Sequence, residues 1–158
     1  MGDPITEPFI LDGRAVQCFE FACLEDHPDN PQGAIVKLSQ LGERFGRRQP
    51  ALAGSQIPSR FNPRSHYFAA TGHAVRGSFL EYFVAHDGPD VLGFPIAEPV
   101  VVDGQIVQDF QLSRLIWSPD TEDGGTVKRE PTGMLWILHQ NPDLLAPVSC
   151  PTEAAVVP

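Results

Sequence analysis

The chain has 158 residues, which suits one domain or two very small ones. Its net charge is −9 and its isoelectric point is 4.8, which argues against binding to nucleic acid or to anionic membrane surfaces, because both need a basic footprint. The 16 proline and 14 glycine residues favour many turns and short elements over long helices.

The first predicted element is a hairpin centred on Asp12-Gly13, with strands at residues 9–11 and 14–19. Asp-Gly tolerates positive φ at both central positions, so it favours the type I′ turn that joins twisted strands. Cys18 and Cys23 follow, five positions apart. On a straight strand they would be about 16 Å apart, so they could form a disulfide only if the chain bends between them. With three cysteines in all, we expect free buried thiols.

Residues 32–45 are predicted to form a short helix, because Ile35, Leu38 and Leu41 recur at helical spacing. The Pro-, Gly- and Ser-rich residues 47–64 indicate a linker. Five arginines cluster around it and form either a solvated surface or a basic patch: Arg44, Arg47, Arg48, Arg60 and Arg64.

A second helix is predicted at residues 78–86, where an apolar stripe is formed by Phe79, Leu80, Phe83 and Val84. Leu92-Gly93-Phe94-Pro95 is a turn signal, and it precedes a second hairpin with strands at residues 100–102 and 105–110 around Asp103-Gly104. Beyond this hairpin we expect a short edge strand at residues 127–130, a buried strand or helical turn at residues 134–138, and a tail without a pattern at residues 147–158.

The two hairpins align with each other at a constant offset of 91 residues and without a gap. Pro4–Phe19 aligns with Pro95–Phe110, and the identities include Pro, Glu, Asp-Gly, Val-Gln and Phe. Farther on, Leu24 aligns with Leu115. A shared turn alone would not produce matches before, within and after the turn, so the sequence predicts a duplicated unit rather than a chance likeness.

The second copy resembles the LGFP repeat of bacterial cell-envelope and secreted proteins. The resemblance rests on Leu92-Gly93-Phe94-Pro95, the Asp103-Gly104 hairpin and Ile116-Trp117-Ser118-Pro119, with a lead-in at residues 71–83. It covers residues 68–120 well. Residues 4–45 resemble a truncated copy that lacks both the helix and the Leu-Gly-Phe expected before Pro4.

The resemblance implies a non-catalytic protein of mainly β class with short helices (α+β), built of duplicated β-hairpin units that form a propeller-like fragment not closed within one chain. We expect a truncated repeat at residues 1–46, a linker at residues 47–64, a full repeat at residues 65–146 and a tail at residues 147–158. One and a half repeats are too few to close a propeller alone.

The function that the resemblance implies is binding or assembly, either on envelope glycan or as a structural subunit of a larger complex. Exposed aromatic side chains would stack on sugar rings, although the same residues would also serve in a core. The Gly-His turn of the lead-in adds a histidine to the candidate ligand-binding residues, which are Tyr67, Phe68, His73, Trp117 and Trp136.

The alternative is a hydrolase with a His-based or metal site around His66 and His73. No carboxylate is placed to complete such a site. The sequence also contains no catalytic or phosphate-binding motif and no zinc-ligand spacing, so we expect no enzyme activity, no metal and no cofactor.

A protein partner or self-association is expected, with cell-wall glycan as a further partner and no membrane insertion. The resemblance places the protein outside the cell or in the envelope. Acidic residues interrupt residues 1–20, however, so we expect no signal peptide there, and a cytoplasmic location stays open.

Overall fold

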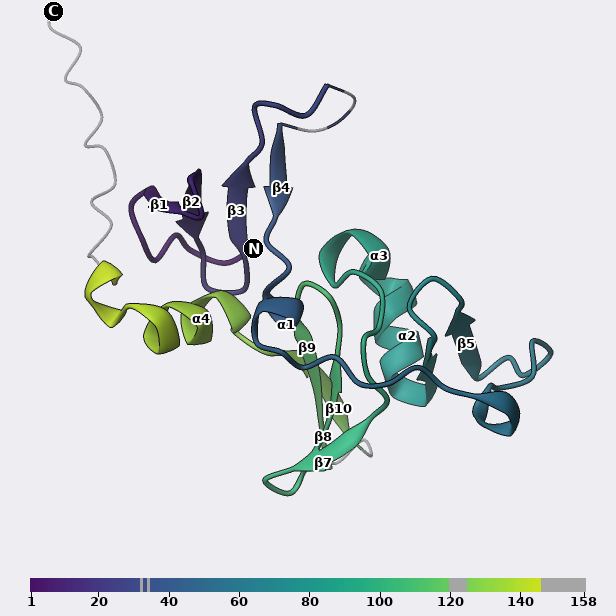
Figure 1. Cartoon of the computed structure of the whole chain (residues 1–158). Helices are drawn as coiled ribbons and strands as arrows, with labels where there is room; N and C mark the ends of the chain where they lie inside the picture. Colours follow the sequence, from purple (N-terminus) through teal and green to yellow (C-terminus); the bar gives the residue numbers. More distant parts are fainter. Residues whose placement is uncertain (32, 34, 120–124, 146–158) are drawn as a thin grey trace, which may run out of the picture.

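The computed structural model describes residues 1–31, 33, 35–119 and 125–145. Within this part, three antiparallel sheets of four, two and four strands lie beside four short α-helices, and no sheet closes on itself. The prediction of a mainly β fold with short helices is therefore confirmed. Figure 1 shows the two four-stranded sheets in different parts of the molecule, with the helices beside and between them.

The first sheet is a meander in which each strand pairs with the one before it. Asp12 and Gly13 have φ angles of 51° and 78°, which confirms the predicted hairpin turn. The four strands are β1 (Phe9–Leu11), β2 (Arg14–Cys18), β3 (Cys23–Asp26) and β4 (Val36–Leu38).

The helix predicted at residues 32–45 is wrong over most of its length. Residues 36–38 form strand β4, which pairs with β3 through the Leu24–Leu38 and Asp26–Val36 positions. Helix α1 is confined to Leu41–Arg44. Backbone hydrogen bonds to a neighbouring strand decided the conformation here, and a short apolar spacing cannot reveal them.

The free thiols expected at Cys18 and Cys23 are also a wrong prediction, because the two residues form a disulfide. The chain reverses between them through a tight turn, in which the Phe19 amide donates to the Ala22 carbonyl. The cysteines therefore lie directly opposite each other on β2 and β3, with Cα atoms 4.0 Å apart. The straight strand assumed for residues 18–23 does not exist.

The second sheet repeats the plan of the first, and its strand bounds fall 91 residues later to within one residue. Asp103 and Gly104 again have positive φ, at 49° and 79°. The predicted edge strand at residues 127–130 is confirmed as β10. The four strands are β7 (Val100–Val102), β8 (Gln105–Asp109), β9 (Arg114–Ser118) and β10 (Thr126–Arg129).

The turn that leads into each hairpin is shared as well, contrary to the expectation that the first copy lacks it. The Met1 carbonyl accepts a hydrogen bond from the Phe21 amide, just as the Leu92 carbonyl accepts one from the Leu112 amide. Gly2 has φ 84° and corresponds to Gly93 of Leu92-Gly93-Phe94-Pro95, with φ 73°. Sequence identity is reduced here to the glycine and the proline, so the match was missed.

Residues 47–91, here called the inserted segment, connect the first unit (residues 1–46) to the second unit (residues 92–145). The predicted helix at residues 78–86 is confirmed as α2. The elements of the inserted segment are η1 (Gly54–Gln56), the hairpin of β5 (Ser65–Phe68) and β6 (His73–Arg76), α2 (Gly77–Ala85) and α3 (Gly88–Val91).

The helix that follows each sheet packs on the other sheet. After the second sheet come α4 (Thr132–Gln140) and η2 (Pro142–Leu144), and α4 lies along the first sheet in Figure 1. The Met134 amide donates to the Glu20 carbonyl, 3.0 Å away. In the reverse direction, the Gly42 amide of α1 donates to the Gln111 carbonyl at the same distance.

Glycines make this crossed packing possible. A Cβ atom on Gly42 would lie 1.9 Å from the Phe110 carbonyl oxygen, and one on Gly133 would lie 2.1 Å from the Phe19 carbonyl oxygen. These positions are again 91 residues apart. Because each helix backbone touches the turn of the opposite sheet, the two units are joined through backbone contacts.

Two apolar cores result. The first lies between the first sheet and α4, around the disulfide, Leu41, Trp136 and Ile137. The second lies between the second sheet and α2, around Phe83 and Leu115.

Candidate functional site

The hairpin of β5 and β6 is fixed to the second unit by two polar side chains that hold one residue. The Ala74 amide donates to Glu98 Oε1 at 2.9 Å, and Gln108 Nε2 donates to the Ala74 carbonyl at 2.8 Å. Gln108 also donates to the Ala97 carbonyl and is completely buried. We call Glu98 and Gln108 the backbone clamp, because together they bind both polar groups of a single peptide position.

His73 lies beside this clamp and is completely buried. Its Nε2 is 3.2 Å from the Gln49 carbonyl oxygen, and its Nδ1 is 3.4 Å from Glu98 Oε1. The Gln49 side-chain oxygen in turn accepts a hydrogen bond from the Glu98 amide. The imidazole therefore connects the start of the inserted segment to the second unit.

A cleft of about 580 Å³ opens between β5 and the corner of α2 and α3. Its floor is apolar: Phe68 packs edge-on against Phe83, with ring centres 5.4 Å apart. Its rim carries charges of both signs and neutral polar groups, which come from Arg60, Asn62, Ser65, His66 and Asp87.

The shape of the corner follows from two backbone features. Asp87 has φ 49°, in the left-handed region, so the chain turns sharply between the helices and leaves the aspartate exposed at the rim. A Cβ on Gly88 would lie 2.4 Å from the Phe83 ring. Only glycine allows α3 to approach the aromatic floor this closely.

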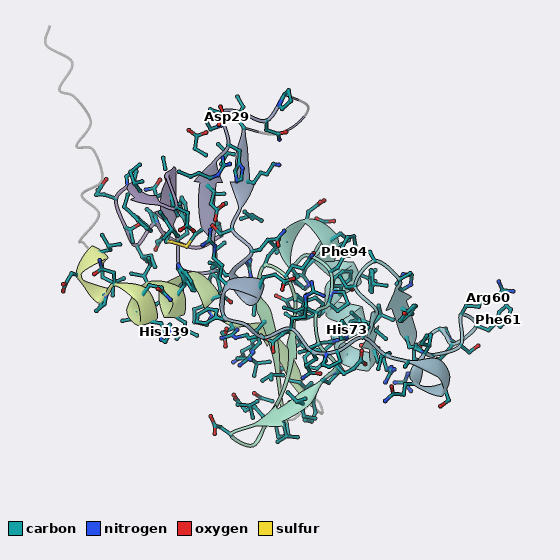
Figure 2. The ribbon with its side chains drawn as sticks, viewed as in Figure 1. Asp29, Arg60, Phe61, His73, Phe94 and His139 are labelled. Atoms are coloured by element: carbon teal, nitrogen blue, oxygen red, sulfur yellow. A yellow bond between two sulfur atoms is a disulfide. The ribbon has the colours of Figure 1, made fainter. Side chains whose placement is uncertain are left out.

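Aromatic rings extend from the floor toward solvent. His66 is exposed and packs edge-on against Phe68, with ring centres 4.6 Å apart. Phe61 is 79% exposed, and the Arg60 guanidinium lies 4.8 Å from its ring centre. Figure 2 shows Arg60 and Phe61 together at an outer end of the molecule, away from the two four-stranded sheets.

The predicted ligand-binding residues do not come together. Phe68 lines the cleft, whereas Tyr67 alternates with it along β5 and so faces the other side of the hairpin. His73 is buried at the clamp. Trp117 is half-buried against the core beneath α2, and Trp136 is 6% exposed and packs edge-on against Phe45.

The structure adds cleft residues that sequence reasoning had assigned elsewhere or passed over. Phe83 belongs to the second core, as the apolar stripe of α2 predicts, and it also lines the cleft. Val84 of the same stripe lines the cleft but is 72% exposed, so its assignment to the core is wrong. Asp87 was not among the predicted site residues, and Arg60 was assigned only to the arginine cluster around the linker. Their convergence depends on the fold of the inserted segment, which no local spacing in the sequence encodes.

Three arginines of the predicted basic cluster pair with carboxylates of this chain. Arg44 bonds to Asp12 and Glu25, Arg47 to Glu130, and Arg48 to Glu43.

The two histidines of the hydrolase alternative have different surroundings. His66 lies opposite Val75 on the hairpin and His73 lies opposite Phe68, so the imidazoles occupy different register positions. His66 borders the cleft, whereas His73 is buried, with its Nε2 against the Gln49 carbonyl and its Nδ1 3.4 Å from Glu98 Oε1. Among the residues that the structure describes, no group of three His, Cys, Asp or Glu side chains is placed to hold a metal ion.

No family model matches the sequence, and no curated protein or solved structure shows significant similarity to the chain. Within the described ranges, no helix is long and apolar enough to span a bilayer.

Proposed function

We propose that this chain is a non-catalytic binding and assembly module of the kind that the LGFP-type resemblance implies. Its glycan ligand lies in the cleft between β5 and the α2–α3 corner. The observation that carries the proposal is the composition of this cleft, which combines an apolar aromatic floor with a polar, charged rim. Ligand sites in proteins have this general composition.

A sugar ring has a weakly polar face and a ring of hydroxyl groups, and the cleft offers a surface for each. The partly exposed ring of Phe68 and the exposed imidazole of His66 provide aromatic surfaces for the ring face. Arg60 and Asp87 provide a donor and an acceptor for hydroxyl groups, and Arg60 would also pair with a carboxylate on an envelope glycan.

We also propose that the two hairpin units are repeats of a propeller-like assembly. Two units with matching strand bounds, matching turns and crossed helices are consistent with repeats of a propeller-like assembly. The disulfide supports an oxidising location, such as the outside of the cell or the envelope.

The test is a titration of the ¹⁵N-labelled chain with soluble cell-wall glycan fragments, followed by NMR. We expect shifts at residues 60–68 and 83–88. The double variant Arg60→Ala/His66→Ala should bind at least about tenfold more weakly, because it removes one charged hydrogen bond and one stacking surface. Lys128→Ala, an exposed change on β10 outside the cleft, is the control. Equal affinity for the double variant and the wild-type chain would overturn the proposal.

The second version of the proposal is a structural subunit of a larger complex, and the exposed apolar side chains of the first unit favour it. Met1 and Val36 are each more than half exposed. The hydrolase alternative has less support, because His73 is engaged by backbone and carboxylate groups and only His66 of the pair borders the cleft.

A further inference from the structure

The backbone clamp of the second unit has a counterpart in the first unit. Glu98 and Gln108 correspond, at the offset of 91 residues, to Glu7 and Gln17. Gln17 Nε2 donates to the Thr6 carbonyl at 3.2 Å, just as Gln108 donates to the Ala97 carbonyl at 3.0 Å. In both units, therefore, the clamp glutamine donates to the carbonyl of the residue that precedes the clamp glutamate.

The two units differ in whether the glutamate and the glutamine also bind the backbone of a neighbouring strand. In the second unit, both clamp residues bind Ala74 of β6. In the first unit, Glu7 is exposed, and among the described residues neither its carboxylate nor the second N–H of Gln17 has a hydrogen-bond partner. Two groups that hold a peptide in one unit thus face outward in the other.

The apolar face beside the clamp shows the same contrast. In the second unit, α2 covers Phe110, Leu115 and Leu92, each of which is 0% exposed. The corresponding residues of the first unit are Phe19 and Leu24, both partly exposed, and Met1, which is 55% exposed.

A shallow groove of about 220 Å³ crosses this face of the first sheet, beside Ala15, Gln17, Leu24 and Val36. In the second sheet, the equivalent residues are Ile106, Gln108, Leu115 and Val127, which belong to the clamp or to the core that α2 covers. The second unit therefore shows what kind of element fits the groove.

We propose that the face formed by Glu7, Gln17, Leu24 and Val36 binds a strand–helix segment of a partner protein, with the chemistry of β6 and α2. The segment places a small residue between Glu7 and Gln17, where both of its backbone polar groups are bound. Aromatic or aliphatic residues at i and i+4 of its helix, like Phe79 and Phe83, fill the groove.

The charge around the groove refines this partner. Asp3, Glu20 and Asp26 occupy the positions of Phe94, Gln111 and Trp117 in the second unit. The partner helix should therefore carry lysine or arginine at its edges, because these would pair with the acidic rim. A second copy of this chain fits poorly, because its own α2 is already packed on its second sheet and moving it would expose that core.

This inference concerns a different surface from the glycan cleft and does not depend on it. The test uses the ¹⁵N-labelled full chain and a synthetic peptide with the sequence of residues 70–87, prepared also with the substitution Glu81→Lys. We expect amide shifts at Ala15, Gln17, Leu24 and Val36, and tighter binding of the lysine peptide.

The double variant Glu7→Ala/Gln17→Ala should bind the peptide at least about tenfold more weakly, because two hydrogen bonds to its backbone are lost. The matched control, Gln140→Ala/Asp143→Ala, removes one amide and one carboxylate at exposed positions and should bind normally.

Three results would overturn the inference. The first is the absence of shifts up to about 1 mM peptide, which is the weak end of specific binding. The second is a set of shifts confined to the second sheet, which would mean that the peptide displaces α2. The third is a dimer that forms without peptide, detected by light scattering, and buries the groove, because a second copy would then be the occupant.

Discussion

The two four-stranded sheets share their register and turns. They differ in how the two residues at the base of the tight turn between the second and third strands are joined. In the first sheet, Cys18 and Cys23 form a disulfide across β2 and β3. In the second sheet, the equivalent residues are Asp109 and Arg114, which lie opposite each other and form a bidentate ion pair at 2.8 and 3.0 Å. A position at the base of a tight turn can thus be closed by a covalent bond or by paired charges.

The second arrangement has consequences that the disulfide lacks. Asp109 is 4% exposed and also lies 3.5 Å from Arg47, which bonds to Glu130 at 2.7 Å. Burial alone lowers the pKa of Arg114, but the hydrogen bonds and charge of Asp109, together with Glu130, outweigh this and raise it. The ionic closure therefore links the second sheet to the chain that leaves α1, whereas the disulfide joins only its own two strands.

The largest expected effect comes from breaking the ionic closure on one side. Asp109→Ala leaves Arg114, whose side chain is 17% exposed, without its main partner and should cost about 4 kcal/mol of unfolding free energy. Chemical denaturation measures it. The control is Asp109→Leu/Arg114→Met, which removes both charges and should cost less than the single change. A double variant at least as unstable as Asp109→Ala would contradict the ion-pair account.

The next largest loss of stability should come from disturbing the packing of α4 and α1 on the opposite sheets. Gly133→Ala puts a methyl group against the Phe19 carbonyl, so α4 must shift away from the first sheet, at a cost of about 3 kcal/mol. Gly42→Ala should behave alike, because it meets the Phe110 carbonyl. Gln140→Ala, exposed on the same helix, should be nearly neutral. The melting temperatures of the three variants measure these effects. An unchanged melting temperature for Gly133→Ala would exclude the close approach of α4 to the Phe19 carbonyl.

Removing the covalent closure should cost less. Cys18→Ser/Cys23→Ser opens a loop of a few residues, for which loop-closure entropy gives about 2 kcal/mol. Urea unfolding with and without reductant measures the loss. The double variant should be insensitive to reductant, and Cys150→Ser should retain the sensitivity. A wild-type chain equally stable in both conditions would show that the disulfide contributes nothing.

The smallest effect concerns pH. Burial of Glu25 raises the pKa of its carboxyl, but the Ser39 hydroxyl and the Arg44 guanidinium outweigh burial and hold the pKa below its ordinary value. The stabilisation is therefore present above the unfolded-state pKa and lost as the pH falls through the folded-state pKa. Glu25→Gln should lose about 1 kcal/mol at pH 7 and show a shallower decline in acid. Parallel stability–pH curves would refute it.

The comparison of the two units also shows what the sequence could predict. Asp-Gly turns and the constant offset of 91 residues identify both hairpins, because turn chemistry is local. The β4 strand and the disulfide were missed, since both depend on how β3 pairs with its neighbours. The cleft was missed for the same reason: Phe68 was chosen for its aromatic ring, but its position beside Asp87 is set by the packing of α2 and α3.

The crossed packing of the helices is tested most directly by nuclear Overhauser effects in the labelled full chain. The account predicts cross-peaks between the α-protons of Gly133 and protons of Phe19 and Ala22, and between those of Gly42 and protons of Phe110 and Gln111. Cross-peaks that instead connect Gly133 to Phe110 and Gly42 to Phe19 would mean that each helix packs on its own sheet, which would contradict the account.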